Sequence, residues 1–321
     1  MRLSRRAILA TTLAAPSLAL AQGWPSGPVR IIVPFAAGGS TDAVARLAAP
    51  GLTQRLGVPV IVENRSGAAG SLGTHAVTQA RPDGNTWLLT FDSHATLAAL
   101  LPNLPFNLTR DLDPVMLIGG APYVIATKPD KPYRTLADVV TAARTQPDAV
   151  NYGSTGNGTI GHLTMVMLGS RAQIRMAHLP YRGGGLAVND TVAGHVDMMI
   201  GSAALVAPQI AAGNLRPIVQ FGPERLPQLR DVPTAVESGF PGLEAEAWWG
   251  VFAPAGTPAA IQQRMGTALG EAFRDERVNR VMTETQQARV VLGGPKVLRP
   301  FLDRQIELWG GLVREHRVQA D

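Results

Sequence analysis

Three glycine-rich segments each follow an apolar run and precede a helical pattern, at residues 38–42, 67–73 and 153–159. The first turn of a helix leaves backbone N–H groups unpaired and carries the positive end of the helix dipole, and both favour an anion. In open α/β sheets, ligands bind at such strand ends. Three such loops with few lysines or arginines nearby predict a ligand held by neutral donors, which suits a carboxylate better than a phosphate.

Enzymatic interpretations of the same loops find less support. Residues 156–161 match G-x-G-x-x-G, but residues 175–180 lack the acid that would bind a ribose. No lysine follows a glycine, so a P-loop is absent, and residues 69–73 lack the first glycine of G-x-S-x-G. Ser154 and His162 could act as a nucleophile and base, but a helix cap and a buried histidine are the simpler explanation of the two residues.

Other residues capable of chemistry also have two interpretations. Asp42 is either a ligand-facing acceptor or a cap in the first turn of a helix. The Trp248–Trp249 pair is either core packing or a stacking platform. The six histidines include no H-x-x-x-H pair and the chain has no cysteine, so we predict no metal site, no disulfide and no cofactor.

The N-terminus has the pattern of an export signal. Arg2, Arg5 and Arg6 precede an apolar run over residues 7–20, and a small-residue site at 19–21 follows. We interpret residues 1–21 as a cleaved signal peptide that directs the chain to the periplasm by the Sec or the twin-arginine route. The run is shorter than the roughly 20 residues of a membrane span.

The remaining chain has the size of a two-domain protein and lacks the charge pattern of a nucleic-acid-binding one. About 300 residues follow the signal, which is enough for two cores. The formal charge of +5 includes three arginines of the signal, so the mature chain carries +2. Lysine occurs only at Lys128, Lys131 and Lys296, and the arginines are scattered, which excludes nucleic-acid binding.

Strands and helices alternate along the chain, which predicts an α/β fold with parallel strands. One series covers residues 29–89 and a second covers 123–220. Thr135 and Asp138 predict a capping box, whereas Thr257 and Pro258 predict a cap and a first-turn proline. The last helix carries apolar residues at three- and four-residue spacing, so one face should be buried. They are Leu298, Phe301, Leu302, Ile306, Trp309 and Val313.

Several motifs resemble the substrate-binding receptors of tripartite tricarboxylate transporters, the Bug family. They are Val33-Pro34-Phe35-Ala36-Ala37-Gly38-Gly39 with Asp42, Val62-Glu63-Asn64-Arg65 with Gly67-Ala68, Pro82-Asp83-Gly84, Tyr152-Gly153-Ser154 with His162-Leu163, and Trp248 to Pro258.

The resemblance implies a type II-like, two-domain periplasmic-binding-protein fold, each domain a mainly parallel sheet flanked by helices. Domain one would comprise residues 22–121 and 245–321, and domain two residues 122–244. The site would use backbone and hydroxyl groups from both domains. The predicted ligand-binding residues are Phe35, Ala36, Gly38, Gly39, Ser40, Thr41, Asp42, Gly67, Ala68, Ala69, Gly70, Ser93, Ser154, Gly158, Thr159, His162, Tyr181 and Arg182.

The function implied is that of a monomeric receptor that closes on a small carboxylate and presents it to permease subunits or a sensor, without catalysis. Two departures bear on specificity. Arg182 stands where the family commonly has lysine, and Ile200-Gly201-Ser202 lacks an acid common there. Fewer acids disfavour a ligand amine, so a plain carboxylate is favoured. The alternatives are an exported hydrolase or lyase and a ligand-sensing module.

Overall fold

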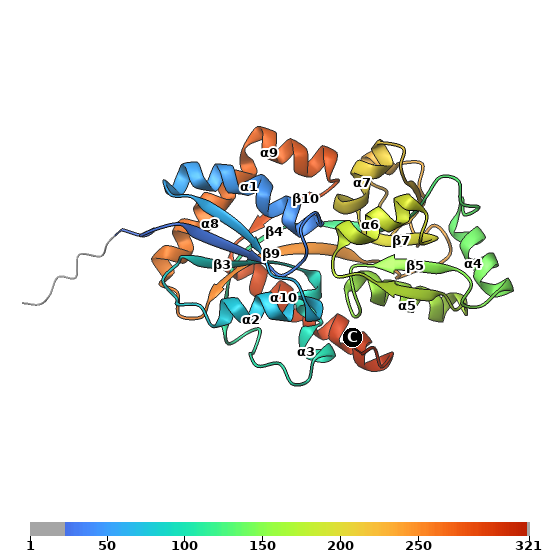
Figure 1. Ribbon diagram of the computed structural model, residues 1–321, viewed down its shortest axis with the longest axis horizontal. Helices are drawn as coiled ribbons and strands as arrows, with labels where there is room; N and C mark the ends of the chain where they lie inside the picture. Colours follow the sequence, from blue (N-terminus) through green and yellow to red (C-terminus); the bar gives the residue numbers. More distant parts are fainter. Residues whose placement is uncertain (1–22, 320–321) are drawn as a thin grey trace, which may run out of the picture.

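The computed structural model describes residues 23–319 and consists of two α/β lobes that share one ten-stranded sheet (Figure 1). The predicted signal peptide lies outside the described residues. Along the sheet the order is β2-β1-β3-β9-β4-β7-β5-β6, and β10 and β8 also pair with β4. The strands are β1 (Val29–Val33), β2 (Val60–Asn64), β3 (Thr86–Phe91), β4 (Leu112–Thr127), β5 (Asn151–Ser154), β6 (Ala177–Pro180), β7 (Met198–Ser202), β8 (Arg216–Gln220), β9 (Glu246–Pro254) and β10 (Arg289–Gly293).

Parallel pairing is confined to the outer strands of each lobe. β1 pairs in parallel with β2 and β3, and β5 with β6 and β7. Every pair made by β4 or β9 is antiparallel. The predicted α/β class is confirmed, but the sheet is mixed rather than mainly parallel. The reason is that β4 and β9 run beside each other in opposite directions and fill the middle of the sheet.

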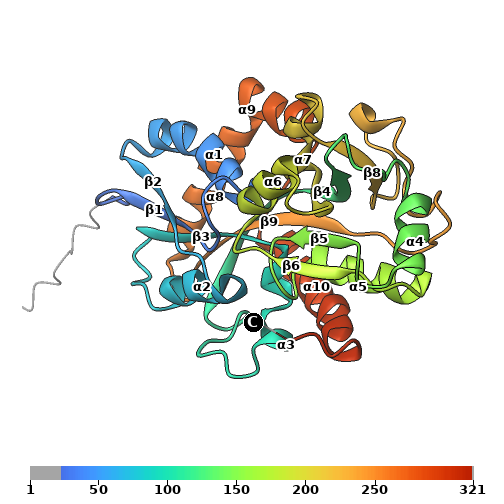
Figure 2. The same cartoon turned by 45° about the vertical axis from the view of Figure 1, so that its right-hand side comes forward.

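The long strand β4 joins the lobes. Its residues up to Pro122 pair with β9, and those from Tyr123 to Thr127 pair with β7. We call β1–β3, β9 and β10 with their helices the first lobe, and β5–β8 with theirs the second. Figure 2 shows β9 crossing back between them. The change of partner falls beside the predicted boundary at residues 121–122, although the boundaries themselves remain a prediction.

Helices cover both faces of the sheet (Figure 1). In the first lobe α1 lies on one side and α2 and α10 on the other, and in the second lobe α6 and α7 lie opposite α5. Among residues 23–319 no helix has the length and apolar character needed to cross a membrane. The α-helices are α1 (Ser40–Leu56), α2 (Ser71–Thr78), α3 (Leu97–Leu100), α4 (Leu136–Thr145), α5 (Ile160–Ala172), α6 (Gly184–Ala193), α7 (Ala203–Ala211), α8 (Ala259–Arg274), α9 (Glu276–Arg280) and α10 (Pro295–Glu315). Shorter turns are η1 (Ala68–Gly70), η2 (Asp92–Ala95), η3 (Pro227–Leu229) and the π-type η4 (Val281–Thr285).

Two helix starts were predicted from capping signals, and one of the two is correct. The capping box predicted at Thr135 and Asp138 is present before α4. The apolar stripe of α10 is also confirmed, since Leu298, Leu302, Trp309 and Val313 are buried. The cap predicted at Thr257 is wrong, because α8 begins at Ala259 and the Thr257 hydroxyl donates to Pro254 O at 2.7 Å. That hydroxyl closes the preceding turn and is not available to the helix.

Candidate functional site

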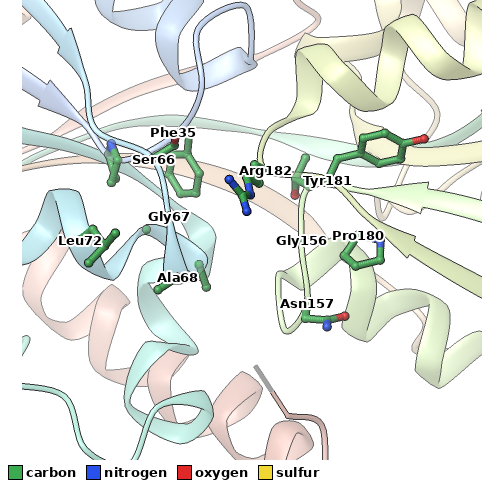
Figure 3. Close-up of a pocket in the computed structure, with 14 residues that line it drawn as sticks. Phe35, Ser66, Gly67, Ala68, Leu72, Gly156, Asn157, Pro180, Tyr181 and Arg182 are labelled. Atoms are coloured by element: carbon green, nitrogen blue, oxygen red, sulfur yellow. The ribbon is translucent and has the colours of Figure 1, made fainter. Parts of the chain in front are cut away.

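A cavity of about 560 Å³ lies between the two lobes (Figure 3). The first lobe contributes the end of β1 and the segment from Ser66 into α2, and the second contributes the loops after β5 and β6. Both walls are therefore built at strand ends, where a ligand in an α/β protein is expected. The lining residues are Pro34, Phe35, Ser66, Gly67, Ala68, Ala69, Gly70, Leu72, Thr155, Gly156, Asn157, Pro180, Tyr181 and Arg182.

The first wall has an unusual backbone. Gly67, Ala68, Ala69 and Gly70 have φ angles of 136°, 45°, 54° and 95°. Left-handed backbone costs a non-glycine residue about 1–2 kcal/mol, and such strain clusters at functional sites. Within residues 23–319 the amides of Gly67, Ala68 and Ala69 make no hydrogen bond, whereas Gly70 N donates to Gly67 O at 3.0 Å. Three consecutive N–H groups on this wall are consequently available to a ligand.

Phe35 forms the floor beside this strained turn. Its ring packs edge-on against Phe91 with centroids 6.0 Å apart, and Phe91 lies 6.1 Å from Trp249 in the core. A Cβ added at Gly70 would lie 3.3 Å from the Phe35 ring, so glycine permits the close approach. The aromatic series fixes one apolar surface of the cavity. Trp249 is fully buried, which supports the packing interpretation of the tryptophan pair rather than a stacking platform.

The second wall is a loop held by hydrogen bonds to the protein itself. Ser154 Oγ accepts from Gly156 N at 3.1 Å and lies 2.7 Å from His178 Nε2. Thr159 Oγ1 donates to Gly156 O at 2.8 Å, and Gly158 N donates to His162 Nδ1 at 3.0 Å. The prediction that residues 153–159 offer unpaired helix-start amides is therefore wrong for Gly156 and Gly158. Gly156 bonds to Ser154 within the same loop, whereas the partner of Gly158 is His162, which lies beyond the loop in α5.

The serine–histidine pair differs from the one weighed in the sequence. Ser154 contacts His178, which stacks on His162 with ring centroids 4.0 Å apart and on Tyr152 at 4.9 Å. Burial, and then the neighbouring His162, lower the pKa of His178 to about 3. Ser154 is fully buried, and among the described residues no carboxylate bonds to His178. An imidazole with so low a pKa is a weak general base, so the pair is suited to holding the loop rather than to nucleophilic attack.

Arg182 is the one charged residue among the fourteen that line the cavity. Its side chain makes no hydrogen bond or ion pair with any residue in the range 23–319. The neighbouring Tyr181 donates its hydroxyl to Asp190 Oδ2 at 2.7 Å, and burial followed by this bond raises the pKa of Tyr181 to about 12. Figure 3 shows that hydroxyl directed away from Arg182, whose guanidinium faces the space between the lobes. The net charge of the lining is +1.

Seven predicted residues line the cavity: Phe35, Gly67, Ala68, Ala69, Gly70, Tyr181 and Arg182. Other members of the first loop lie elsewhere. Gly38, Gly39 and Ser40 line a separate depression of about 350 Å³ beside α6 and α7. Ala36 meets the second lobe, since a Cβ at Gly183 would lie 3.0 Å from Ala36 Cβ, and Thr41 is buried.

Asp42 has protein partners in place of a ligand. Its carboxylate accepts from Gly38 N, Arg46 Nε and Asn64 Nδ2, each at 3.0 Å. Burial acts to raise its pKa, but the hydrogen bonds from Arg46, Gly38 and Asn64 outweigh it and hold the pKa below the usual value. Of the two interpretations that the sequence allowed, the geometry supports the structural one.

The remaining predicted residues form the surroundings of the cavity. Ser93 is fully buried at the end of β3, and its Oγ has no partner within residues 23–319. Gly158 packs against Leu100, and Thr159 caps α5 by accepting from His162 N. The lining residues absent from the prediction adjoin the predicted loops, so a wider window around each glycine would have included most of them. They are Pro34, Ser66, Leu72, Thr155, Gly156, Asn157 and Pro180.

Comparison with known proteins agrees with this arrangement. A family model described as the tripartite tricarboxylate transporter family receptor matches residues 44–317. The chain belongs to this receptor family. Among other family relatives, protein BugT of Bordetella pertussis is 35% identical over 298 residues, covering 92% of this chain and 91% of that protein. The resemblance drawn from the sequence motifs is confirmed.

Two solved structures are close to this receptor in shape. Rhodopseudomonas palustris Rpa4515, described with adipate, has a TM-score of 0.87 and 28% identity, covering 92% of this chain and 99% of that one. MatC from Rhodopseudomonas palustris, described with bound malate, has a TM-score of 0.85 and 31% identity, covering 90% of this chain and 100% of that one. The two-lobed arrangement of this chain is therefore shared with these two solved structures.

Proposed function

We propose that this chain is a periplasmic receptor that captures a small organic carboxylate between its lobes and releases it unchanged to a membrane transporter. The observation that carries the proposal is the unpaired Arg182 guanidinium facing a cavity whose lining has no acidic residue. An anion is the ligand that such a lining favours, because its charge would be compensated on binding. The adipate and malate described with two structurally similar proteins support a carboxylate.

The two walls would meet the carboxylate from opposite sides. Arg182 offers a bidentate fork, and the amides of Gly67, Ala68 and Ala69 offer neutral donors. The lobes touch beside the cavity, since a Cβ at Gly185 would lie 3.1 Å from Gly38 O. A ligand bridging both walls favours this closed arrangement over an open one, and a transporter or sensor can read the difference. The buried Ser154 and the low pKa of His178 support binding without catalysis.

Thermal unfolding and calorimetry with organic acids test the proposal. A bound acid should raise the melting temperature of the mature chain, because it binds only the native state. The variant Arg182→Gln should lose about 1.5–3 kcal/mol of binding, which is roughly tenfold to a hundredfold in affinity. Arg81→Gln, at an exposed arginine outside the cavity lining, is the matched control and should bind as wild type does. Binding of amines or sugars in place of acids, or equal binding by both variants, would refute the proposal.

A further inference from the structure

We infer, on the basis of the proposed function, that the preferred ligand is a monocarboxylate with an apolar body rather than a di- or tricarboxylate. The first argument is charge. Arg182 is alone among the lining residues in carrying a charge, so it compensates one carboxylate. A second carboxylate would have only neutral donors available in the lining. Moving an ionised group from water into a cavity without a counter-charge is unfavourable, so each extra carboxylate weakens binding.

The second argument is the character of the walls. Apolar side chains face the cavity from both lobes, including Phe35, Leu72 and Pro180. Leu72 is 59% exposed, which is high for a leucine and leaves apolar surface that a ligand can cover. The Tyr181 hydroxyl is bound to Asp190, so only its ring is presented to the cavity. A hydrocarbon chain or ring covers these apolar surfaces, whereas a hydroxyl group placed against them would find no hydrogen-bond partner there.

The third argument is size. The cavity, at about 560 Å³, falls within the roughly 300–1,000 Å³ of typical ligand pockets. A four-carbon acid leaves much of such a space to water. A body of five or more carbons attached to one carboxylate occupies more of it and reaches from Arg182 toward Phe35 and Leu72. The carboxylate of the ligand would thus be bound by Arg182, and its apolar body would be covered by Phe35 and Leu72.

Isothermal titration of the mature chain with length-matched ligands tests this inference. We expect hexanoate and cyclohexanecarboxylate to bind at least tenfold more tightly than adipate, and 1-hexanol to show no binding. Adipate binding as tightly as hexanoate, with both weakened by Arg182→Gln, would overturn the inference and leave the proposed function in place. Binding of 1-hexanol as tightly as hexanoate, or no binding by any acid, would overturn both.

Two variants at Leu72 test the apolar contact and the charge argument separately. Leu72→Ser should weaken hexanoate severalfold and leave acetate unchanged. Leu308→Ser changes a leucine that is 55% exposed on α10 outside the cavity lining, and it serves as the matched control. Leu72→Arg should supply a second cation and raise the affinity for adipate about tenfold relative to hexanoate. If Leu72→Arg leaves that ratio unchanged, charge does not set the preference and the inference fails.

Discussion

Asp92 lies at the junction of the lobes, and its replacement by asparagine should change how stability depends on pH. The carboxyl is fully buried after β3, and its Oδ2 accepts from the Tyr123 hydroxyl at 2.6 Å. Its Oδ1 has no partner among the described residues. Burial raises its pKa to about 8, against the opposing hydrogen bonds from the Tyr123 hydroxyl and the Ser93 backbone. At neutral pH the native protein consequently holds a protonated carboxylic acid here.

The sign and size of the effect follow from this raised pKa. The unfolded chain releases the proton near the ordinary value of 3.8, whereas the folded chain keeps it until about 8. The stabilisation from the bound proton is therefore complete below the unfolded-state pKa of 3.8, and it is lost as the pH rises through the folded-state pKa of about 8. Between the two values the free energy of unfolding should fall by about 1.4 kcal/mol for each pH unit. Asparagine cannot titrate, so Asp92→Asn should lack this contribution.

Urea denaturation followed by tryptophan fluorescence at pH 5, 6, 7 and 8 measures the effect. The wild-type free energy of unfolding minus that of Asp92→Asn should fall by about 1.4 kcal/mol per unit across this range. Taking the difference removes the contributions of other titrating groups. Tyr123→Phe removes a donor that favours the ionised form of Asp92. In this variant the decline of the free energy of unfolding should therefore continue to higher pH. A difference that stays constant from pH 5 to 8 would show that Asp92 is not protonated in the native state.

Three further changes test the lobe contact, the loop and a helix cap. Gly185→Ala places a Cβ 3.1 Å from Gly38 O, so it should disfavour closure by about 1–3 kcal/mol and weaken ligand binding in calorimetry without lowering the melting temperature of the free chain. Ser154→Ala leaves the Gly156 amide without its acceptor, so the free energy of unfolding in urea should fall by about 1–3 kcal/mol. Thr135→Ala removes the cap of α4 and should cost about 1 kcal/mol in the same assay.

For each of these three variants, the contrary result would contradict the stated reason. Unchanged affinity in Gly185→Ala would mean that the lobes do not need this contact to hold a ligand. Unchanged stability in Ser154→Ala would show that solvent satisfies the Gly156 amide. If Thr135→Ala is neutral, Asp138 maintains the start of α4 without its partner.

The sequence was most informative about features that depend on neighbours within a few residues. The Thr135 capping box and the stripe of α10 follow from helical spacing, which is local. The family motifs also follow from contiguous residues, and they indicated the fold class and the receptor family. The loop at Gly67–Gly70 was predicted as a binding segment because a glycine-rich turn before a helix offers unpaired amides, and the amides of Gly67, Ala68 and Ala69 make no hydrogen bond within residues 23–319.

Features that depend on distant residues needed the structure. The antiparallel middle of the sheet arises because β4 and β9, more than 100 residues apart, pair along most of their length. Ser154 meets His178 because β5 and β6 pair in parallel with Tyr152 beside His178, a register that no local pattern contains. The Asp42 carboxylate is already hydrogen-bonded within the protein, because Asn64, at the end of the neighbouring strand, donates to it.

The sequence by itself thus determined which segments fold as strands and helices and which loops can offer amides, because these depend on side-chain spacing and on backbone freedom. Tertiary structure alone decided which amides remain free and which charge faces the cavity. A donor stays available only where no distant partner packs against it, and the pairing of the sheet sets those partners. That selection left Gly67, Ala68, Ala69 and Arg182 open to a ligand, while Asp42, Gly156 and Gly158 are bonded within the protein.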